Sequence, residues 1–256
     1  RYGSDGVSTE VHAIYEPPQK VDEFGAIEIV EEDTDVQRRI EAAAVGLQLQ
    51  KVGIMFCHGY RKTKSAMSSI EALFAAEQQL ASCDGDIEAK PNRFVTVVVR
   101  ETEDGLADFQ AYQMTRQCME MVAKGMLLWG MDDPYICDID EMFTAYTVKQ
   151  NKEKTRTMKN VDTSVPVEFL IQNVAVKTLS SPSLFPLDFP IANRPGTSTG
   201  HGVLSHYFHQ HKQKPFGRKL ADFQVLIALG AIFSPDDIRC IGEFVMNQSA
   251  TDLGEG

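Results

Sequence analysis

The sequence predicts a mixed α/β protein in which helices pack on a sheet. The segment 94–100 is rich in β-branched residues, which favour strands. Helical patterns over 36–47 and 68–81 both begin at residues that cap helices, and they enclose the apolar run 51–57. This alternation of strands and helices, followed by a hairpin and a further helix, indicates layers of sheet and helix.

The composition is that of an ordinary globular protein. Of 256 residues, 43% are hydrophobic and 24% are charged, which is too apolar for a disordered chain. The net charge of −11 argues against nucleic-acid binding, which needs Lys and Arg to neutralise phosphates. No apolar stretch reaches the ~20 residues of a membrane helix, so we expect no membrane insertion. The length allows one large domain or two modest ones.

The N-terminal elements follow from local signals. Residues 8–15 alternate in a way that suits a strand, and Pro17 and Pro18 end it. The first helix, over 36–47, takes its N-cap from the residues at 33–35.

The middle of the chain combines a capped helix with a hairpin. Ser68 and Glu71 form a capping box at the start of the second helix. The turn signal at 104–105 joins strand 94–100 to a return strand over 109–114. A third helix is expected over 116–124.

The C-terminal third is expected to end in helices. A long strand is predicted over 165–177, and the segment 180–195, rich in Pro and Ser, is expected to be extended. An apolar stripe over 220–227 predicts a helix. Ser234, followed by a proline and two aspartates, predicts the start of the last helix, and the tail from 248 is expected to fray.

One local cluster of cations needs an interpretation. It comprises Lys149, Lys152, Lys154, Arg156 and Lys159. It could form a basic binding face, but no aromatic residues alternate with the cations for base stacking. We therefore interpret it as a solvated hairpin or loop.

Cysteines and histidines do not predict a metal site, and no cofactor is expected. No Cys-x-x-Cys pair occurs among the five cysteines, so we interpret them as reduced, mostly buried thiols. Four histidines cluster at His201, His206, His209 and His211 without acidic or thiol ligands at regular spacing. The helix dipole favours imidazoles at a helix C-terminus, and we interpret the cluster in this way.

The segment Val52-Gly53-Ile54-Met55-Phe56-Cys57-His58-Gly59 resembles the metalloisopeptidase strand of MPN (JAMM) domains. In active members, two histidines and an aspartate hold zinc, and a nearby serine accompanies them. The resemblance places the two histidines at Phe56 and His58, the serine at Ala66 and the aspartate at Ser69. A single remaining imidazole cannot hold a catalytic zinc, so we predict an inactive site.

Six further motifs, in the same order along the chain, resemble the nuclear protein localization four family. Residues 13–19 carry that family's "AIYEPPQ" pattern. The segments LQLQKVGIMF at 47–56, PVEFLI at 166–171 and DFQVL at 222–226 resemble its "LGLRKVGWIF", "PVEYLI" and "DFHLL" patterns. The chain also matches a Tyr-Gln-x-x-x-Gln-Cys-Met pattern at 112–119 and a "FPIENR" pattern at 189–194, where Ala192 replaces the glutamate.

This resemblance implies a domain organisation. Residues 1–122 would form an inactive, N-terminally truncated MPN-like domain with layered sheet and helices, residues 123–248 a family-specific α+β C-terminal domain, and residues 249–256 a frayed tail. The chain begins at Arg1 and lacks the family's ubiquitin-like domain and zinc fingers, so we expect a fragment or a reduced paralogue.

The resemblance also implies a non-catalytic adaptor of the ubiquitin–proteasome system, including endoplasmic-reticulum-associated degradation. The implied partners are ubiquitin or an unfolded ubiquitin segment, the ubiquitin fusion degradation one protein, and the AAA unfoldase valosin-containing protein, reached through regions missing here. The implied localisation is cytoplasm and nucleus, and the surface of the endoplasmic reticulum membrane.

Two other functions stay open. One is a zinc-dependent metalloisopeptidase with atypical ligands, drawn from Cys57 and His58. The other is a generic protein-interaction domain.

Two segments are candidates for lining a binding groove. The alternative for both is core packing. The candidate residues are Phe189, Pro190, Ile191 and Arg194 in one segment and Met67, Ile70 and Phe74 in the other.

Overall fold

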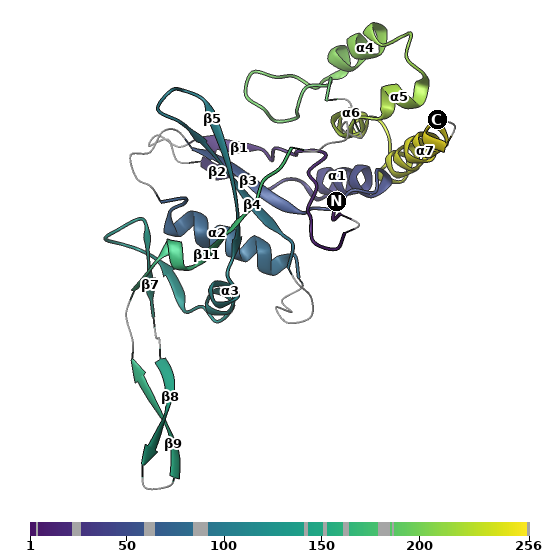
Figure 1. The fold of residues 1–256 in the computed structure, drawn as a ribbon. Helices are drawn as coiled ribbons and strands as arrows, with labels where there is room; N and C mark the ends of the chain where they lie inside the picture. Colours follow the sequence, from purple (N-terminus) through teal and green to yellow (C-terminus); the bar gives the residue numbers. More distant parts are fainter. Residues whose placement is uncertain are drawn as a thin grey trace. The chain divides into compact units, whose positions relative to one another are not determined.

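The computed structural model describes residues 1–3, 5–21, 27–58, 65–83, 92–140, 143–150, 153–160, 164–178, 185 and 187–254. The chain divides into two compact units. The sheet unit comprises residues 2–9 and 52–178, and the helical unit comprises residue 1, residues 10–51 and residues 179–256. Most of their elements are labelled in Figure 1. The fold is mixed α/β, as predicted from the sequence.

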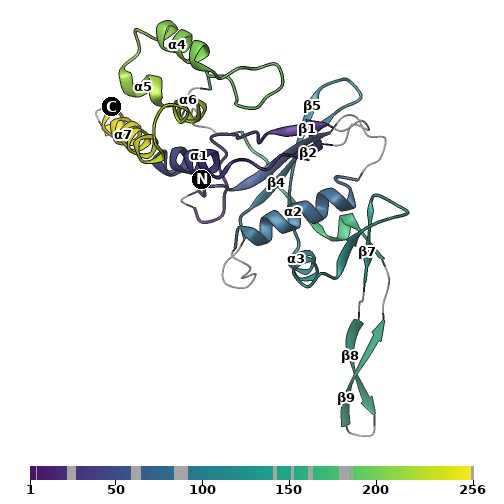
Figure 2. The same cartoon turned by 180° about the vertical axis from the view of Figure 1, so that it is seen from behind.

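The sheet unit is built on a four-stranded sheet of order β11-β5-β4-β3. Only β3 and β4 are parallel, as expected for strands joined through a helix. Helices α2 and α3 lie beside this sheet (Figure 1, Figure 2) and share one apolar core with it. The elements are β3 (Gly53–His58), α2 (Ser69–Ala81), β4 (Val95–Glu101), β5 (Ala107–Met114), α3 (Arg116–Ala123) and β11 (Ile171–Val174).

A second, three-stranded sheet of order β10-β7-β6 completes the sheet unit, beside a separate two-stranded hairpin. This hairpin contains the basic segment 149–159, so the predicted hairpin is confirmed there. The exposure of the segment to solvent stays a prediction. These elements are β6 (Leu127–Trp129), β7 (Ile136–Ile139), β8 (Phe143–Gln150), β9 (Glu153–Asn160), β10 (Ser164–Pro166) and the 3₁₀ turn η1 (Val167–Phe169).

The helical unit packs its helices around a core of its own. Helices α1 and α7, which lie far apart in the sequence, are neighbours in this unit (Figure 1). The elements are β1 (Gln19–Val21), β2 (Ile27–Ile29), α1 (Thr34–Gly46), α4 (His201–Gln210), α5 (Phe216–Leu220), α6 (Phe223–Leu229) and α7 (Pro235–Gly254).

The predicted helix starts are confirmed. The side chain of Asp33 caps α1 by accepting from Asp35 N. Ser68 and Glu71 form the reciprocal capping box of α2. At α7, the Ser234 hydroxyl accepts from the backbone N–H of Asp237. Of the histidine cluster, His201, His206 and His209 lie in α4, and His211 is its C-cap residue.

Three predicted elements are wrong. Residues 8–15 do not form a strand, because only an isolated bridge at Thr9 pairs with other backbone. The long strand over 165–177 is interrupted by η1 after Pro166, which has no N–H for a ladder. The helix over 220–227 is two helices, because Asp222 caps the N-terminus of α6.

The two compact units do not follow the boundary at 122/123. Residues 10–51 join the C-terminal residues because α1 packs on α7, whereas residues 123–178 stay with the sheet. Helix α7 also continues to Gly254, through most of the tail expected to fray. Among the described residues, no helix has the length and apolar character needed to cross a membrane.

Candidate functional site

Asp222 is the buried centre of a junction in the helical unit. Its carboxylate accepts hydrogen bonds from the backbone N–H groups of Gln224 at 2.8 Å and Phe189 at 3.3 Å. Burial raises the pKa of this carboxyl above its ordinary value, and the hydrogen bonds from backbone N–H groups oppose that increase. Asp222 thus both caps α6 and fixes the segment that begins at Phe189.

Gln224 extends the junction in two directions. Its side-chain oxygen accepts from Ala192 N at 3.0 Å, and its side-chain nitrogen donates to Ile14 O at 2.7 Å. The amide therefore satisfies one donor and one acceptor from two different loops, and the donor, Ala192 N, would otherwise be buried without a partner.

Asn193 and Arg194 complete the junction on its exposed side. Asn193 donates to the hydroxyl of Tyr15 at 3.1 Å and to Glu16 O at 2.9 Å. Arg194 Nε donates to the Glu16 carboxylate at 2.9 Å. Tyr15 in turn donates to the carboxylate of Glu32, and burial is the largest cause of its raised pKa. Three sequence motifs, at 13–19, 189–194 and 222–226, are thus joined by hydrogen bonds.

The predicted groove residues of this segment lie in different environments. Phe189 is in the core, edge-on to Tyr207 with ring centroids 5.4 Å apart. Pro190 and Ile191 are partly buried, and Arg194 is exposed. The structure therefore gives Phe189 a packing role, and it leaves a binding role for this segment as a proposal.

The predicted residues on α2 differ in the same way. Met67 is fully buried and Phe74 is partly buried, whereas the side chain of Ile70 is 63% exposed. Ile70 is thus the residue of this segment that is open to a partner.

The four positions aligned with the metal site serve the fold of the sheet unit. Phe56 and Ala66 pack in its core. Ser69 is buried, and its hydroxyl accepts from Gly130 N at 3.1 Å. His58 ends β3. Within the described part of the chain, no group of three or more His, Cys, Asp or Glu side chains is placed to hold a metal ion.

Cys57 and His58 are poorly placed to act together. They are successive residues of β3, and successive side chains of a strand point to opposite faces. Cys57 is exposed and lies on the face away from α2. The geometry does not favour one ion held by both.

The sheet face away from α2, here called the outer face, is apolar. Strand register places Met55, Val97, Ala111 and Val174 in one row across all four strands. A second row contains Cys57, Val99 and Phe109. Phe109 is 55% exposed and Met55 is also exposed, so this face offers apolar surface to solvent.

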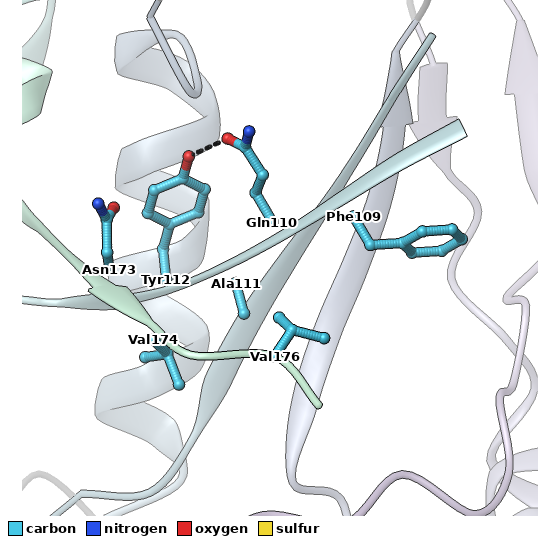
Figure 3. A pocket seen from close by; sticks show the side chains of 7 residues that line it. All are labelled: Phe109, Gln110, Ala111, Tyr112, Asn173, Val174 and Val176. Carbon is cyan, nitrogen blue, oxygen red and sulfur yellow. Dashed lines mark hydrogen bonds between the residues drawn. The ribbon is translucent and has the colours of Figure 1, made fainter. Parts of the chain in front are cut away.

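Two shallow hollows lie at this sheet. The first, of about 300 Å³, opens where β11 ends beside β5 (Figure 3). Phe109 and Val176 line it, and the Tyr112 hydroxyl donates to Gln110 within it at 2.5 Å. The second, of about 240 Å³, lies at the end of β3, where Cys57, His58 and Leu106 line it.

The sequence contained a signal for the outer face. The run Val97-Val98-Val99 is apolar on consecutive positions, and such a strand is apolar on both faces. It does not show which of the two faces the helices cover, so Phe109 and Met55 were not predicted as surface residues.

The fold and these features define a mixed α/β protein with an exposed apolar sheet face. A family model described as the NPL4 family matches residues 5–255, and the chain belongs to that family. NPL4-like protein 1 from Arabidopsis thaliana is 28% identical over 98% of this chain and 57% of its own length. Nuclear protein localization protein 4 homolog from Dictyostelium discoideum is 30% identical over 88% of this chain and 35% of its own length.

The human nuclear protein localization protein 4 homolog is also similar, with 28% identity over 88% of this chain and 41% of its own length. The chain therefore spans 57% of the length of the first of these relatives and less than half of the length of the other two.

Proposed function

We propose that this chain is a non-catalytic adaptor of the ubiquitin–proteasome system. In this role it helps to present polyubiquitinated substrates to the AAA unfoldase valosin-containing protein, including substrates of endoplasmic-reticulum-associated degradation. It works with the ubiquitin fusion degradation one protein in the nucleus and cytoplasm and at the endoplasmic reticulum surface. Membership of the NPL4 family supports the proposal, as do the names of several relatives, which refer to nuclear protein localization.

The observation that carries the proposal is the outer face. It exposes apolar side chains, and the hollow at the end of β11 adjoins it through Phe109, Ala111 and Val174. An extended, unfolded segment exposes the apolar side chains that such a face can bury, and burial of apolar surface drives association. We assign an unfolded ubiquitin segment to this face.

The positions aligned with zinc ligands favour an adaptor over a hydrolase. Phe56, at the position of a ligand histidine, packs against the core, and the Ser69 hydroxyl, at the position of the aspartate, accepts from Gly130 N. Side chains used in this way are not available to a metal. In our proposal the chain retains the layered architecture and has lost hydrolysis.

The test measures binding to ubiquitin-derived peptides. Peptides that tile the ubiquitin sequence would be labelled and titrated with the full chain while fluorescence anisotropy is recorded. Phe109→Asp should weaken the best binder about tenfold or more, because it places a charge on an apolar interface. The matched control is Val7→Asp, which changes an exposed apolar residue in the turn 5–8 of the same unit and should leave binding unchanged.

Two results would overturn the proposal. One is failure of every ubiquitin peptide to bind, or equal weakening by both variants. The other is cleavage of diubiquitin by the zinc-loaded chain, which would instead favour the metalloisopeptidase with Cys57 and His58.

A further inference from the structure

The edge strand β6 exposes an unusual amount of apolar surface. Trp129 is 57% exposed and Met131 is 81% exposed, and their side chains touch, with Trp129 Nε1 3.3 Å from Met131 Sδ. Leu128, on the opposite face of the strand, is exposed as well. Proteins usually protect an edge with Lys, Pro or a bulge, whereas this edge reads Leu-Leu-Trp-Gly-Met.

The other edge of the same sheet has such protection. The order is β10-β7-β6, so β10 and β6 are the two edges among the described strands. Strand β10 ends in Pro166, which cannot donate to an added strand. Unlike β10, therefore, β6 is an edge strand that exposes apolar side chains and has no proline to prevent pairing with a further strand.

Along β6, the backbone N–H and C=O groups of alternate residues point toward β7 and away from it. Asp140 N donates to Met126 O, so residues 126 and 128 direct their main-chain groups to β7. Because these directions alternate along a strand, the N–H and C=O of Trp129 face the open edge. A partner strand could bond to them.

The segment that contains β6 and β7 is acidic. Ser69 bonds to the backbone of Gly130 and Pro134, which places the start of α2 beside the loop that follows β6. The stretch 126–140, which contains β6 and β7, carries four carboxylates and neither Lys nor Arg, and Lys124 lies two residues before it. These carboxylates, here called the acidic rim, belong to Asp132, Asp133, Asp138 and Asp140.

We propose that the edge of β6 is a docking site for an extended segment of a partner protein in which apolar and basic residues alternate. The segment adds a strand beside Trp129, its apolar residues cover Trp129 and Met131, and its Lys or Arg residues meet the acidic rim. Backbone pairing supplies the geometry, and the side chains select the sequence. This site goes beyond ubiquitin handling, since it lies on the second sheet of the unit and not on the outer face.

The chain supplies its own reporter for this site. Trp129 is the single tryptophan, so intrinsic tryptophan fluorescence observes this edge alone. Two synthetic peptides would be titrated into the full chain. One is Lys-Val-Lys-Ile-Lys-Val, and the other replaces each Lys by Glu. The basic peptide should shift the emission to shorter wavelength with saturation, and the acidic peptide should cause no shift.

A variant pair locates the binding. Met131→Lys keeps the fluorophore and adds a like charge at the edge, so it should weaken the basic peptide roughly three- to tenfold. Leu106→Lys adds the same charge at an exposed residue of the β4–β5 turn and should change nothing. Absence of saturation, equal response to both peptides, or equal loss in both variants would overturn the proposal. Because Phe109→Asp leaves this edge intact, failure of the outer face and failure of β6 are distinguishable.

Discussion

Gly46 of α1 and Gly242 of α7 bring the backbones of the two helices into contact. A Cβ atom built on Gly242 would lie 2.7 Å from the carbonyl carbon of Gly46, and one on Gly46 would lie 2.6 Å from Arg239 O. Both contacts are with backbone, which cannot move aside as a flexible side chain can. The absence of side chains at this pair therefore allows the close approach of α1 and α7, which unites the two parts of the helical unit.

Gly242→Ala should destabilise the helical unit. The added methyl group would force α1 and α7 apart, and overpacking of this kind costs about 1–3 kcal/mol. Thermal unfolding followed by circular dichroism should show a lower midpoint. The control is Gly202→Ala in α4, where an added Cβ meets no atom within 4 Å. That variant should be neutral or stabilised by up to about 1 kcal/mol, because alanine favours a helix over glycine. Equal effects of both variants would contradict the contact.

Gln224→Leu should also lower stability. Leucine keeps the approximate volume but leaves Ala192 N and Ile14 O without the partners that Gln224 provides. An unsatisfied buried donor such as Ala192 N costs about 1–3 kcal/mol, whereas Ile14 O belongs to an exposed residue, so we expect a loss of roughly 1–3 kcal/mol in chemical denaturation. Gln172→Leu, at an exposed position of β11, should stay within about 0.5 kcal/mol of the original chain. A neutral Gln224→Leu would mean that water replaces the amide.

The features predicted from the sequence are those that depend on neighbouring residues. Ser68 and Glu71 are three positions apart, so their capping box is visible as a pattern. The junction is not visible in this way, because Asp222 is 33 positions from Phe189 and Gln224 is 210 positions from Ile14. Family resemblance marked these segments as motifs, but it did not show that they bond to one another.

Burial was the less predictable property of the candidate site. Phe189 and Ile70 are both apolar residues in marked segments, yet one is in the core and the other is exposed. Which side of an element is covered depends on elements that are distant in the sequence. The strand over 8–15 was predicted wrongly for the same reason, since an alternating pattern forms a strand only where a neighbouring strand is available to pair.

Asp222 should make stability depend on pH in a defined direction. Its pKa is raised in the folded state, so folding favours the protonated form. The contribution of this group is therefore fully present below its unfolded pKa and is lost as pH rises through the folded value. The unfolding free energy of the original chain minus that of the Asp222→Asn variant should therefore fall as pH rises above about 4, the ordinary pKa of an aspartate. Urea titrations at several pH values measure this difference, and a difference that rises with pH would contradict the assignment.

Thiol labelling should separate the five cysteines by their surroundings. Burial raises the pKa of Cys118 to about 12 and that of Cys137 to about 11, so both stay protonated at pH 8. Only the thiolate reacts rapidly, and both side chains are inaccessible as well. With N-ethylmaleimide and mass spectrometry of digested protein, exposed Cys57 and Cys240 should be modified first.

Cys118 and Cys137 should react in the native chain only when it opens, and all five cysteines should react alike in concentrated guanidinium chloride. That denatured sample is the control for intrinsic differences between peptides. Modification of Cys118 as fast as Cys57 under native conditions would contradict the packing of α3 and β7 in one core. Slow modification of Cys57 would mean instead that the outer face is covered. That result would conflict with the proposal that the outer face binds unfolded segments.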